Sequence, residues 1–283
     1  MLNSPLIKKI INLAIEEDLS MGDITSQLTI QPTQISSANI ISREKVLTCG
    51  LPLVEKICAV IDKKIDVNYL LPDGQLVEES EILAKLTGPT ISLLMAERTL
   101  LNFLQRTCGV ATHTQSIVRK FENIIILDTR KTIPGWRILD KYATFIGGAK
   151  NHRANLGDMI LIKNNHIDAN SGDIQKVLAS VFAKKPEYMQ VEIEVRNIAE
   201  LRLVLQYYNS FPVNIIMLDN MSNSDIESAI QIINKQSSVI KVEISGGIKE
   251  ERVSSLKDLG VKYLSMGKLT NQARNVDISM RII

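Results

Sequence analysis

The second half of the chain alternates short apolar runs with segments whose apolar residues recur at helical spacing. The runs have the length and β-branched content of buried strands and span residues 124–128, 159–163, 189–195, 214–219, 240–245 and 261–267. Helix-period segments lie at residues 173–184, 198–208, 224–234 and 250–259. These repeated strand–helix units predict a parallel sheet covered by helices. Their number favours an α/β barrel over an open doubly wound sheet, and no G-x-G-x-x-G motif follows the first run.

The first half of the chain is organised differently. Helical spacing in "MLNSPLIKKIINLAIEED" predicts an amphipathic helix at the start. Three β-like runs with turn residues between them predict a small antiparallel sheet, and they span residues 38–47, 64–70 and 81–88. Residues 93–104 predict a long helix that leads into a second helix over residues 112–121. The change of pattern places a domain boundary near residue 110.

The composition argues against several classes of protein. A chain of 283 residues with 45% apolar residues can form two domains, or one barrel with an added domain. A net charge of +2, from 33 basic and 31 acidic residues, is not that of a nucleic-acid or polybasic membrane surface. Cys49, Cys58 and Cys108 form no C-x-x-C pair, which argues against a disulfide framework or zinc site.

The predicted location is the cytoplasm. No run approaches the roughly 18 apolar residues of a membrane-spanning helix. Charged residues interrupt the apolar run of the first helix, unlike the core of a signal peptide. We therefore expect no membrane partner.

Charged residues gather at the expected carboxyl ends of the strands, where ligands bind in parallel α/β folds. Together with two residues from a following loop, the cations at these ends predict a site for a multiply charged anion. These candidates are Arg130, Lys131, Lys163, His152 and Arg153. Each alone is more typical of a solvated loop, but their coincidence at several strand ends favours a functional site.

Acidic and small residues complete the same edge of the sheet. Glu194 and Asp219 offer the hard oxygen atoms that hold Mg²⁺ when a phosphate supplies further ligands. Small residues at the last two strand ends allow main-chain N–H groups to approach a phosphate. They are Ser245, Gly246, Gly247 and Gly267. The pattern predicts a metal-phosphate substrate.

These positions resemble one known family. The run "LDTRKTIPGWRILDKYATFIGGAKNHRANLGDMILIKNNHI", with "EIEV", "IMLDNMS", "VEISGGI" and "YLSMGKLT", closely resembles the quinolinate phosphoribosyltransferases, also called nicotinate-nucleotide pyrophosphorylases (carboxylating). Nearer the N-terminus, "AIEEDLSMGDITS" and "MAERTLLNFLQRTCGVAT" are similar to the same family, as is "DISMRI" near the end. The resemblance covers nearly the whole chain.

The resemblance implies an N-terminal α/β sandwich domain over residues 1–110, on which residues 270–283 pack back. An incomplete, seven-stranded α/β barrel would follow over residues 111–269. The implied reaction transfers phosphoribose from phosphoribosyl pyrophosphate to quinolinate with decarboxylation, a step of NAD biosynthesis that uses Mg²⁺. The implied assembly is a homodimer in which Arg98 crosses the interface, with a larger oligomer left open.

The resemblance also implies roles for individual residues. The quinolinate set would be Arg98, Arg130, Lys131, His152, Arg153 and Lys163. The phosphoribosyl pyrophosphate set would be Lys131, Lys163, Glu194, Asp219, Ser245, Gly246, Gly247 and Gly267, with Glu194 and Asp219 also holding the metal. Lys131, Lys163, Glu194 and Asp219 would be the catalytic group.

Two positions depart from the family pattern, and several alternatives stay open. Asn164 stands where the family commonly has Asp, and Ala149 where a third glycine is usual, which requires φ below zero at Ala149. The alternatives are a paralogue associated with molybdenum transport, an aldolase-like barrel with Lys163 as Schiff-base nucleophile, and a metabolite sensor without turnover. The order of substrate addition and the proton donor after decarboxylation also stay open.

Overall fold

The computed structural model describes residues 1–121, 123–247, 252, 255–256 and 259–283. The chain divides into two compact units. Unit 1 comprises Met1–Arg119, Lys131–Ala149 and Gly267–Ile283, and unit 2 comprises Lys120–Arg130 and Lys150–Met266. The expected boundary near residue 110 stays a prediction.

Unit 1 contains the predicted antiparallel sheet. Its four strands run in the order β12-β1-β5-β3, and β2 pairs with β4 beside them. The strands are β1 (Ile35–Ser42), β2 (Val46–Leu47), β3 (Asp66–Leu70), β4 (Leu76–Val77), β5 (Ile82–Pro89) and β12 (Ile278–Ile282). Strand β12 pairs antiparallel with β1, so the end of the chain belongs to the same sheet as the N-terminal strands.

The helices of unit 1 pack either on this sheet or on the long helix that contacts it. They are α1 (Pro5–Leu19), α2 (Ile24–Thr29), α3 (Pro52–Ile61), α4 (Thr90–Val118), α5 (Arg137–Ile146) and α11 (Lys268–Asn271). The expected helix break between residues 104 and 112 is wrong, because α4 is continuous there. Gly109 lies within α4 because a Cβ atom at this position would lie 2.2 Å from the main-chain oxygen of Arg274. The glycine therefore serves close packing rather than a helix end.

Unit 2 is built on the predicted parallel sheet. Its order is β6-β11-β10-β9-β8-β7, and each of these neighbouring pairs is parallel. The strands are β6 (Ile125–Leu127), β7 (Ile160–Ile162), β8 (Val191–Val195), β9 (Ile215–Asp219), β10 (Lys241–Ser245) and β11 (Tyr263–Ser265). The α/β fold class is confirmed and the barrel is open. Six strands lie within the described residues, and a single parallel bridge between Leu127 and Lys150 stands at the seventh position.

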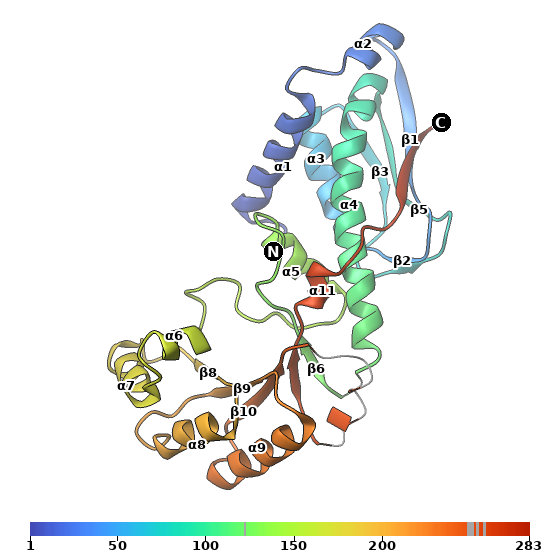
Figure 1. Ribbon diagram of the computed structural model, residues 1–283. Coiled ribbons are helices and arrows are strands. Elements are labelled where there is room, and N and C mark those ends of the chain that lie inside the picture. The colour runs from blue at the N-terminus through green and yellow to red at the C-terminus, as the bar shows by residue number, and fades with distance from the viewer. Residues whose placement is uncertain (122, 248–251, 253–254, 257–258) are drawn as a thin grey trace. The chain divides into compact units, whose positions relative to one another are not determined.

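Helices α7, α8 and α9 lie on the outer side of this sheet (Figure 1). With the short α6, they are α6 (Asn164–Asp168), α7 (Ile174–Lys184), α8 (Ile198–Gln206) and α9 (Asn223–Gln236). Asp173, Asn197 and Ser222 cap the three longer helices by accepting main-chain N–H bonds. The helix predicted over residues 250–259 lies largely outside the described residues. Within the described part of the chain, no helix is long and apolar enough to span a membrane.

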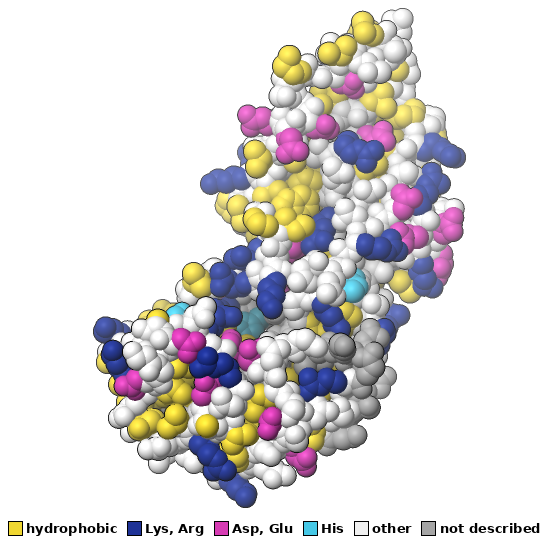
Figure 2. Space-filling model, viewed as in Figure 1, with side chains coloured by type: hydrophobic (Ala, Val, Ile, Leu, Met, Phe, Trp, Pro, Cys, Tyr) yellow, Lys and Arg dark blue, Asp and Glu magenta, His cyan; other side chains and the backbone are white. Residues whose placement is uncertain are grey.

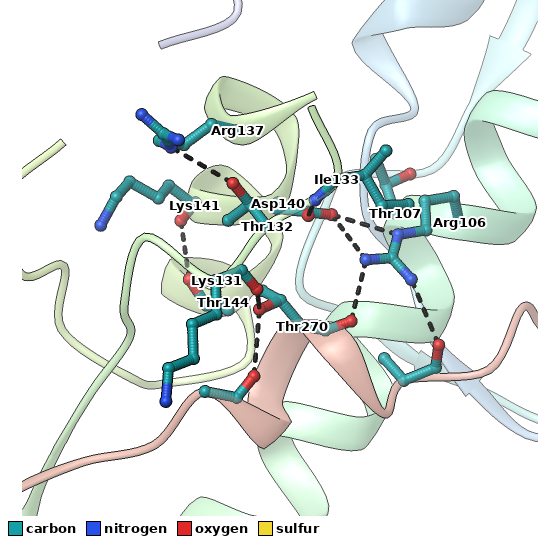
Figure 3. Close-up of polar contacts among 12 residues, drawn as sticks. Arg106, Thr107, Lys131, Thr132, Ile133, Arg137, Asp140, Lys141, Thr144 and Thr270 are labelled. Carbon is teal, nitrogen blue, oxygen red and sulfur yellow. Dashed lines mark hydrogen bonds and ion pairs between the residues drawn. The ribbon is translucent and has the colours of Figure 1, made fainter. Parts of the chain in front are cut away.

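A buried ion pair joins the helices of unit 1 (Figure 3). Arg106 of α4 donates to Asp140 Oδ1 of α5 from Nε at 3.1 Å and from Nη2 at 3.0 Å. Its Nη2 also donates to the main-chain oxygen of Thr270 at 2.9 Å, in α11. Burial raises the pKa of Asp140, and the charge of Arg106 opposes that rise. Arg106 is therefore the main charged partner of this carboxylate, which also accepts a main-chain hydrogen bond.

We expect Arg106→Met to lower the free energy of unfolding of unit 1 by about 3 to 5 kcal/mol, because it leaves the Asp140 carboxylate buried and uncompensated. The fluorescence of Trp136, the single tryptophan, reports unfolding of this unit. The double variant Arg106→Met/Asp140→Leu should lose less than the single variant. A larger loss in the double variant would contradict the explanation.

Candidate functional site

The pleat of the parallel sheet decides which side chains share its inner face. Residues two apart in a strand point to the same face. Glu194 and Asp219 stand at the carboxyl ends of β8 and β9, and Ser245 at the end of β10. Glu192 and Glu243 lie two residues earlier in β8 and β10. The sheet therefore carries an upper row of polar residues at its edge and a lower pair of acids beneath it.

Two arginines of unit 2 repel each other. Burial lowers the pKa of Arg153, the charge of Arg130 lowers it further, and Glu192 acts in the opposite direction. Arg153 Nη1 donates to the main-chain oxygen of Met159 at 3.1 Å. The Nε atom of Arg130 is buried and has no hydrogen-bond partner within the described residues. Two partly desolvated guanidinium groups so arranged favour an anionic ligand.

A second group combines acids, an amide and a lysine. Burial raises the pKa of Glu194, Lys163 lowers it, and the charge of Asp219 raises it. Lys163 Nζ lies 3.7 Å from Glu194 Oε2, and its side chain is half-exposed. Asn164 Nδ2 donates to Glu194 Oε1 at 2.6 Å, while Asn164 Oδ1 is buried without a partner in the described part of the chain. These oxygen atoms form a neighbourhood suited to a hard cation.

The turn after β10 approaches the end of β9 closely. Gly246 has φ 90°, and a Cβ atom there would lie 2.1 Å from Asn220 Oδ1. Only glycine fits this position without displacing Asn220. Asn220 in turn donates its main-chain N–H to the Ser245 oxygen at 3.0 Å. Gly247, with φ 40°, follows as the last described residue of the turn.

Beneath this edge lies a cluster of His152, Glu192 and Glu243. His152 Nε2 is 3.1 Å from Glu192 Oε2 and 3.6 Å from Glu243 Oε2. Both glutamates are almost fully buried. Burial, and next the charge of Glu192, raise the pKa of Glu243 to about 7. Glu243 therefore keeps its proton up to a higher pH than an ordinary carboxyl group does.

Three predicted residues belong to unit 1. Arg98 is exposed on α4. The Lys131 side chain runs past Gly267, where a Cβ atom would lie 2.6 Å from Lys131 Cδ. The Lys131 main-chain oxygen accepts a hydrogen bond from Thr270 Oγ1 at 2.7 Å (Figure 3). Nearby, the Ile133 N–H donates to Asp140 Oδ2 at 3.2 Å, so the buried ion pair also fixes this segment.

The structure thus brings Arg130 near Arg153, both Lys163 and Asp219 near Glu194, and Lys131 near Gly267. Sequence reasoning missed Glu192 and Glu243. The signal was available, since "VEIEV" and "KVEIS" each place an acid two residues before a polar strand end, on the same face. Ala149 keeps a φ outside the left-handed region, as its methyl group requires.

On the visible face of the molecule, Lys and Arg side chains are interspersed with Asp and Glu (Figure 2). The surface in view therefore has no broad expanse of one charge. The cations that matter are those gathered at the strand ends. Fold and site together define an enzyme-like α/β barrel whose strand-end residues are suited to an anionic ligand.

Comparisons with known proteins identify the family. The models described as Quinolinate phosphoribosyl transferase, N-terminal domain and C-terminal domain, match residues 23–108 and 110–281. Quinolinate phosphoribosyltransferase (decarboxylating) 1b of Nicotiana tabacum is 38% identical, over 98% of this chain and 82% of its own length. The solved nicotinate-nucleotide pyrophosphorylase of Ehrlichia chaffeensis is 34% identical, with a TM-score of 0.89 over 100% of both chains. This chain belongs to the quinolinate phosphoribosyltransferase family.

A bacterial relative extends the comparison. The probable nicotinate-nucleotide pyrophosphorylase (carboxylating) of Bacillus subtilis is 34% identical, over 99% of this chain and 95% of its own length. The similarity therefore includes both units rather than the barrel alone.

The raised pKa of Glu243 predicts a pH dependence of stability. The folded protein retains a proton that the unfolded chain, with its ordinary value of 4.5, has released. This contribution is fully present below the unfolded pKa and is lost as pH rises through about 7. Between about pH 5 and about pH 8, thermal unfolding should therefore show wild type losing stability relative to Glu243→Gln. Parallel profiles for the two proteins would contradict the assignment.

Proposed function

We propose that this protein transfers phosphoribose from phosphoribosyl pyrophosphate to the ring nitrogen of quinolinate, and releases pyrophosphate and CO₂ to give nicotinate mononucleotide. Membership of the family supports this reaction. The observation that carries it in this chain is the proximity of Arg130 and Arg153, together with the buried Arg130 Nε, which has no hydrogen-bond partner among the described residues. A dicarboxylate is the simplest ligand that neutralises both.

Quinolinate binding is assigned to the cations. Arg130 and Arg153 take the two carboxylates through charge-assisted hydrogen bonds. His152 belongs to the same segment of unit 2 as Arg153 and supports it. Arg98 is part of the proposal as a residue supplied by a second copy of the chain in a homodimer. Its exposure on α4 is consistent with that role.

Phosphoribosyl pyrophosphate is assigned to the acids, the lysines and the glycine turn. Glu194 and Asp219 bind the ribose hydroxyls, while Lys131 and Lys163 face the diphosphate. The 5-phosphate is bound by Ser245, Gly246, Gly247 and Gly267. At Gly246 the neighbouring Asn220 excludes a side chain, so the turn offers main chain alone where the phosphate is proposed to bind.

The residues present fit Mg²⁺. Two carboxylates, Glu194 and Asp219, influence each other electrostatically, and the buried Asn164 Oδ1 offers a further hard oxygen. These three residues would hold the ion, which supplies positive charge to oppose the charge of the diphosphate when bound. Asn164 replaces the acid expected from the family, and here it donates a hydrogen bond that an Asp carboxylate could not donate.

The residues of the chain reduce the barrier by neutralising and orienting charge. Both substrates are anions, so their repulsion must be offset before the ring nitrogen can reach the ribose carbon. The lysines stabilise the negative charge that grows on the departing diphosphate. The arginines then hold the carboxylate that leaves as CO₂ from the ring carbon beside the new cationic nitrogen. The proton that replaces it comes from Lys131, Lys163 or water.

The aldolase-like alternative receives no support from the site. A Schiff-base lysine needs a desolvated amine with a lowered pKa. Lys163 is half-exposed and pairs with Glu194. The cytoplasm remains the proposed location, and the three buried free thiols support it. Some relatives are named mitochondrial or chloroplastic.

A substrate panel tests the proposed function. With phosphoribosyl pyrophosphate and Mg²⁺, we expect pyrophosphate and CO₂ release with quinolinate and neither product with pyridine monocarboxylates, because two guanidinium groups require two carboxylates. Removing Mg²⁺ should abolish turnover. In the same assay Arg130→Ala and Lys131→Ala should each lower kcat/KM by about 2 to 4 kcal/mol in transition-state terms.

Arg202→Ala on the outer helix α8 is the matched control and should keep the wild-type rate. Ligand binding without product would indicate a metabolite sensor. Turnover of a different pyridine carboxylate would indicate a paralogue with another substrate. Wild-type kinetics in both site variants would remove the proposed roles of Arg130 and Lys131.

A further inference from the structure

The hydrogen bonds of His152 define its protonation. Its Nδ1 accepts a hydrogen bond from the main-chain N–H of Arg153 at 2.8 Å. An acceptor nitrogen has a lone pair and no proton, so the ring proton is on Nε2. Nε2 lies 3.1 Å from Glu192 Oε2, which accepts that proton's hydrogen bond. The arrangement selects the neutral Nε2–H tautomer.

This tautomer argues against a metal in the cluster. His152, Glu192 and Glu243 offer ligand atoms within 4.8 Å of one another, which resembles a transition-metal site. A metal at Nε2 would require a lone pair there and the proton on Nδ1. In this protein Nδ1 already faces the N–H of Arg153. The cluster is therefore a hydrogen-bond support rather than a metal centre.

The support reaches three strands of unit 2. The main-chain N–H of His152 donates to Asp128 Oδ1 at 2.8 Å, just after β6. Asp128 is fully buried. The ring of His152 reaches Glu192 on β8 and approaches Glu243 on β10. Since the same ring accepts from Arg153, the start of the Arg153 loop is fixed to the interior of the sheet.

The cluster also buries polar atoms that it does not use. Glu192 Oε1, Glu243 Oε1 and Ser265 Oγ are buried without a partner in the described residues. Burying two such carboxyl groups is costly and adds no packing that an apolar residue would not supply. The presence of Glu192 and Glu243 beneath the site is explained if they hold in place the segment of His152 and Arg153, whose position matters for binding.

We propose that Glu192 and Glu243 are positioning residues that act through His152 to fix Arg153, so that its guanidinium meets a carboxylate of the ligand beside Arg130. The identity of that ligand as quinolinate rests on the proposed function. The sequence led us to expect His152 as a direct ligand of the dicarboxylate. The geometry instead assigns its ring to the support of Arg153.

The tautomer can be measured directly in the full-length protein. The chain has three histidines, so ¹⁵N-histidine labelling gives few signals, and the signal lost in His152→Asn is that of His152. With no ligand added, we expect the Nδ1 shift of an acceptor nitrogen and the Nε2 shift of a protonated nitrogen. A proton on Nδ1, with or without one on Nε2, would overturn the proposal.

Kinetics separates positioning from mere stability. Glu192→Gln keeps an oxygen that can accept from Nε2–H, whereas Glu192→Leu has a similar volume and no acceptor. We expect Glu192→Leu to raise the KM for quinolinate by up to about 100-fold, with the KM for phosphoribosyl pyrophosphate unchanged. Glu192→Gln should restore most of the lost affinity. An equal loss in both variants, or a wild-type KM in Glu192→Leu, would overturn the proposal.

Ile193→Val is the matched control, because Ile193 is buried in the same strand and points to the opposite face. It should lower the melting temperature without changing the KM for quinolinate. If Glu192→Leu does not fold, the KM of Glu192→Gln for quinolinate and the tautomer measurement test the proposal instead. A wild-type protein that forms no nicotinate mononucleotide would refute the proposed function, whereas the tautomer measurement needs no turnover and judges the positioning claim separately.

Discussion

The repulsion between Arg130 and Arg153 is the constraint on which the site depends. Two neighbouring guanidinium groups that are partly shielded from water repel each other, and negative charge nearby reduces this repulsion. Glu192 offsets part of this repulsion at Arg153. An anion that approaches both groups relieves this repulsion, and the proposed ligand brings two carboxylates.

The pleat of the sheet organises the remaining chemistry. A period of two residues gives each of β8 and β10 one polar residue at its end and one acid beneath it. The upper residues can reach a ligand, while the lower acids contact His152. Binding groups and their supports therefore come from the same strands, so the rigidity of the sheet is transmitted to the loop that carries Arg153.

The sequence predicted those features that depend on local pattern. The six parallel strands and helices α7, α8 and α9 follow from periodicity, and strand ends are recognisable because β-branched runs stop at polar residues. Helix α3 was not anticipated, although its apolar face is regular. The expected break in α4 was wrong because Gly109 serves a contact with residue 274, far along the chain.

The missing parts of the site are also non-local. The Arg106–Asp140 pair joins residues 34 apart, and His152 meets acids 40 and more residues away. No pattern within one element identifies such partners. Strand alternation indicates that Glu192 and Glu243 face inward, but only the folded chain shows that one histidine ring lies within reach of both.

A structure of the protein with quinolinate bound tests the central claim most directly. We expect Arg130 and Arg153 each to donate to a carboxylate of the ligand while His152 Nδ1 keeps its bond from the Arg153 N–H. Quinolinate bound elsewhere, or either guanidinium turned into solvent with the ligand present, would contradict it.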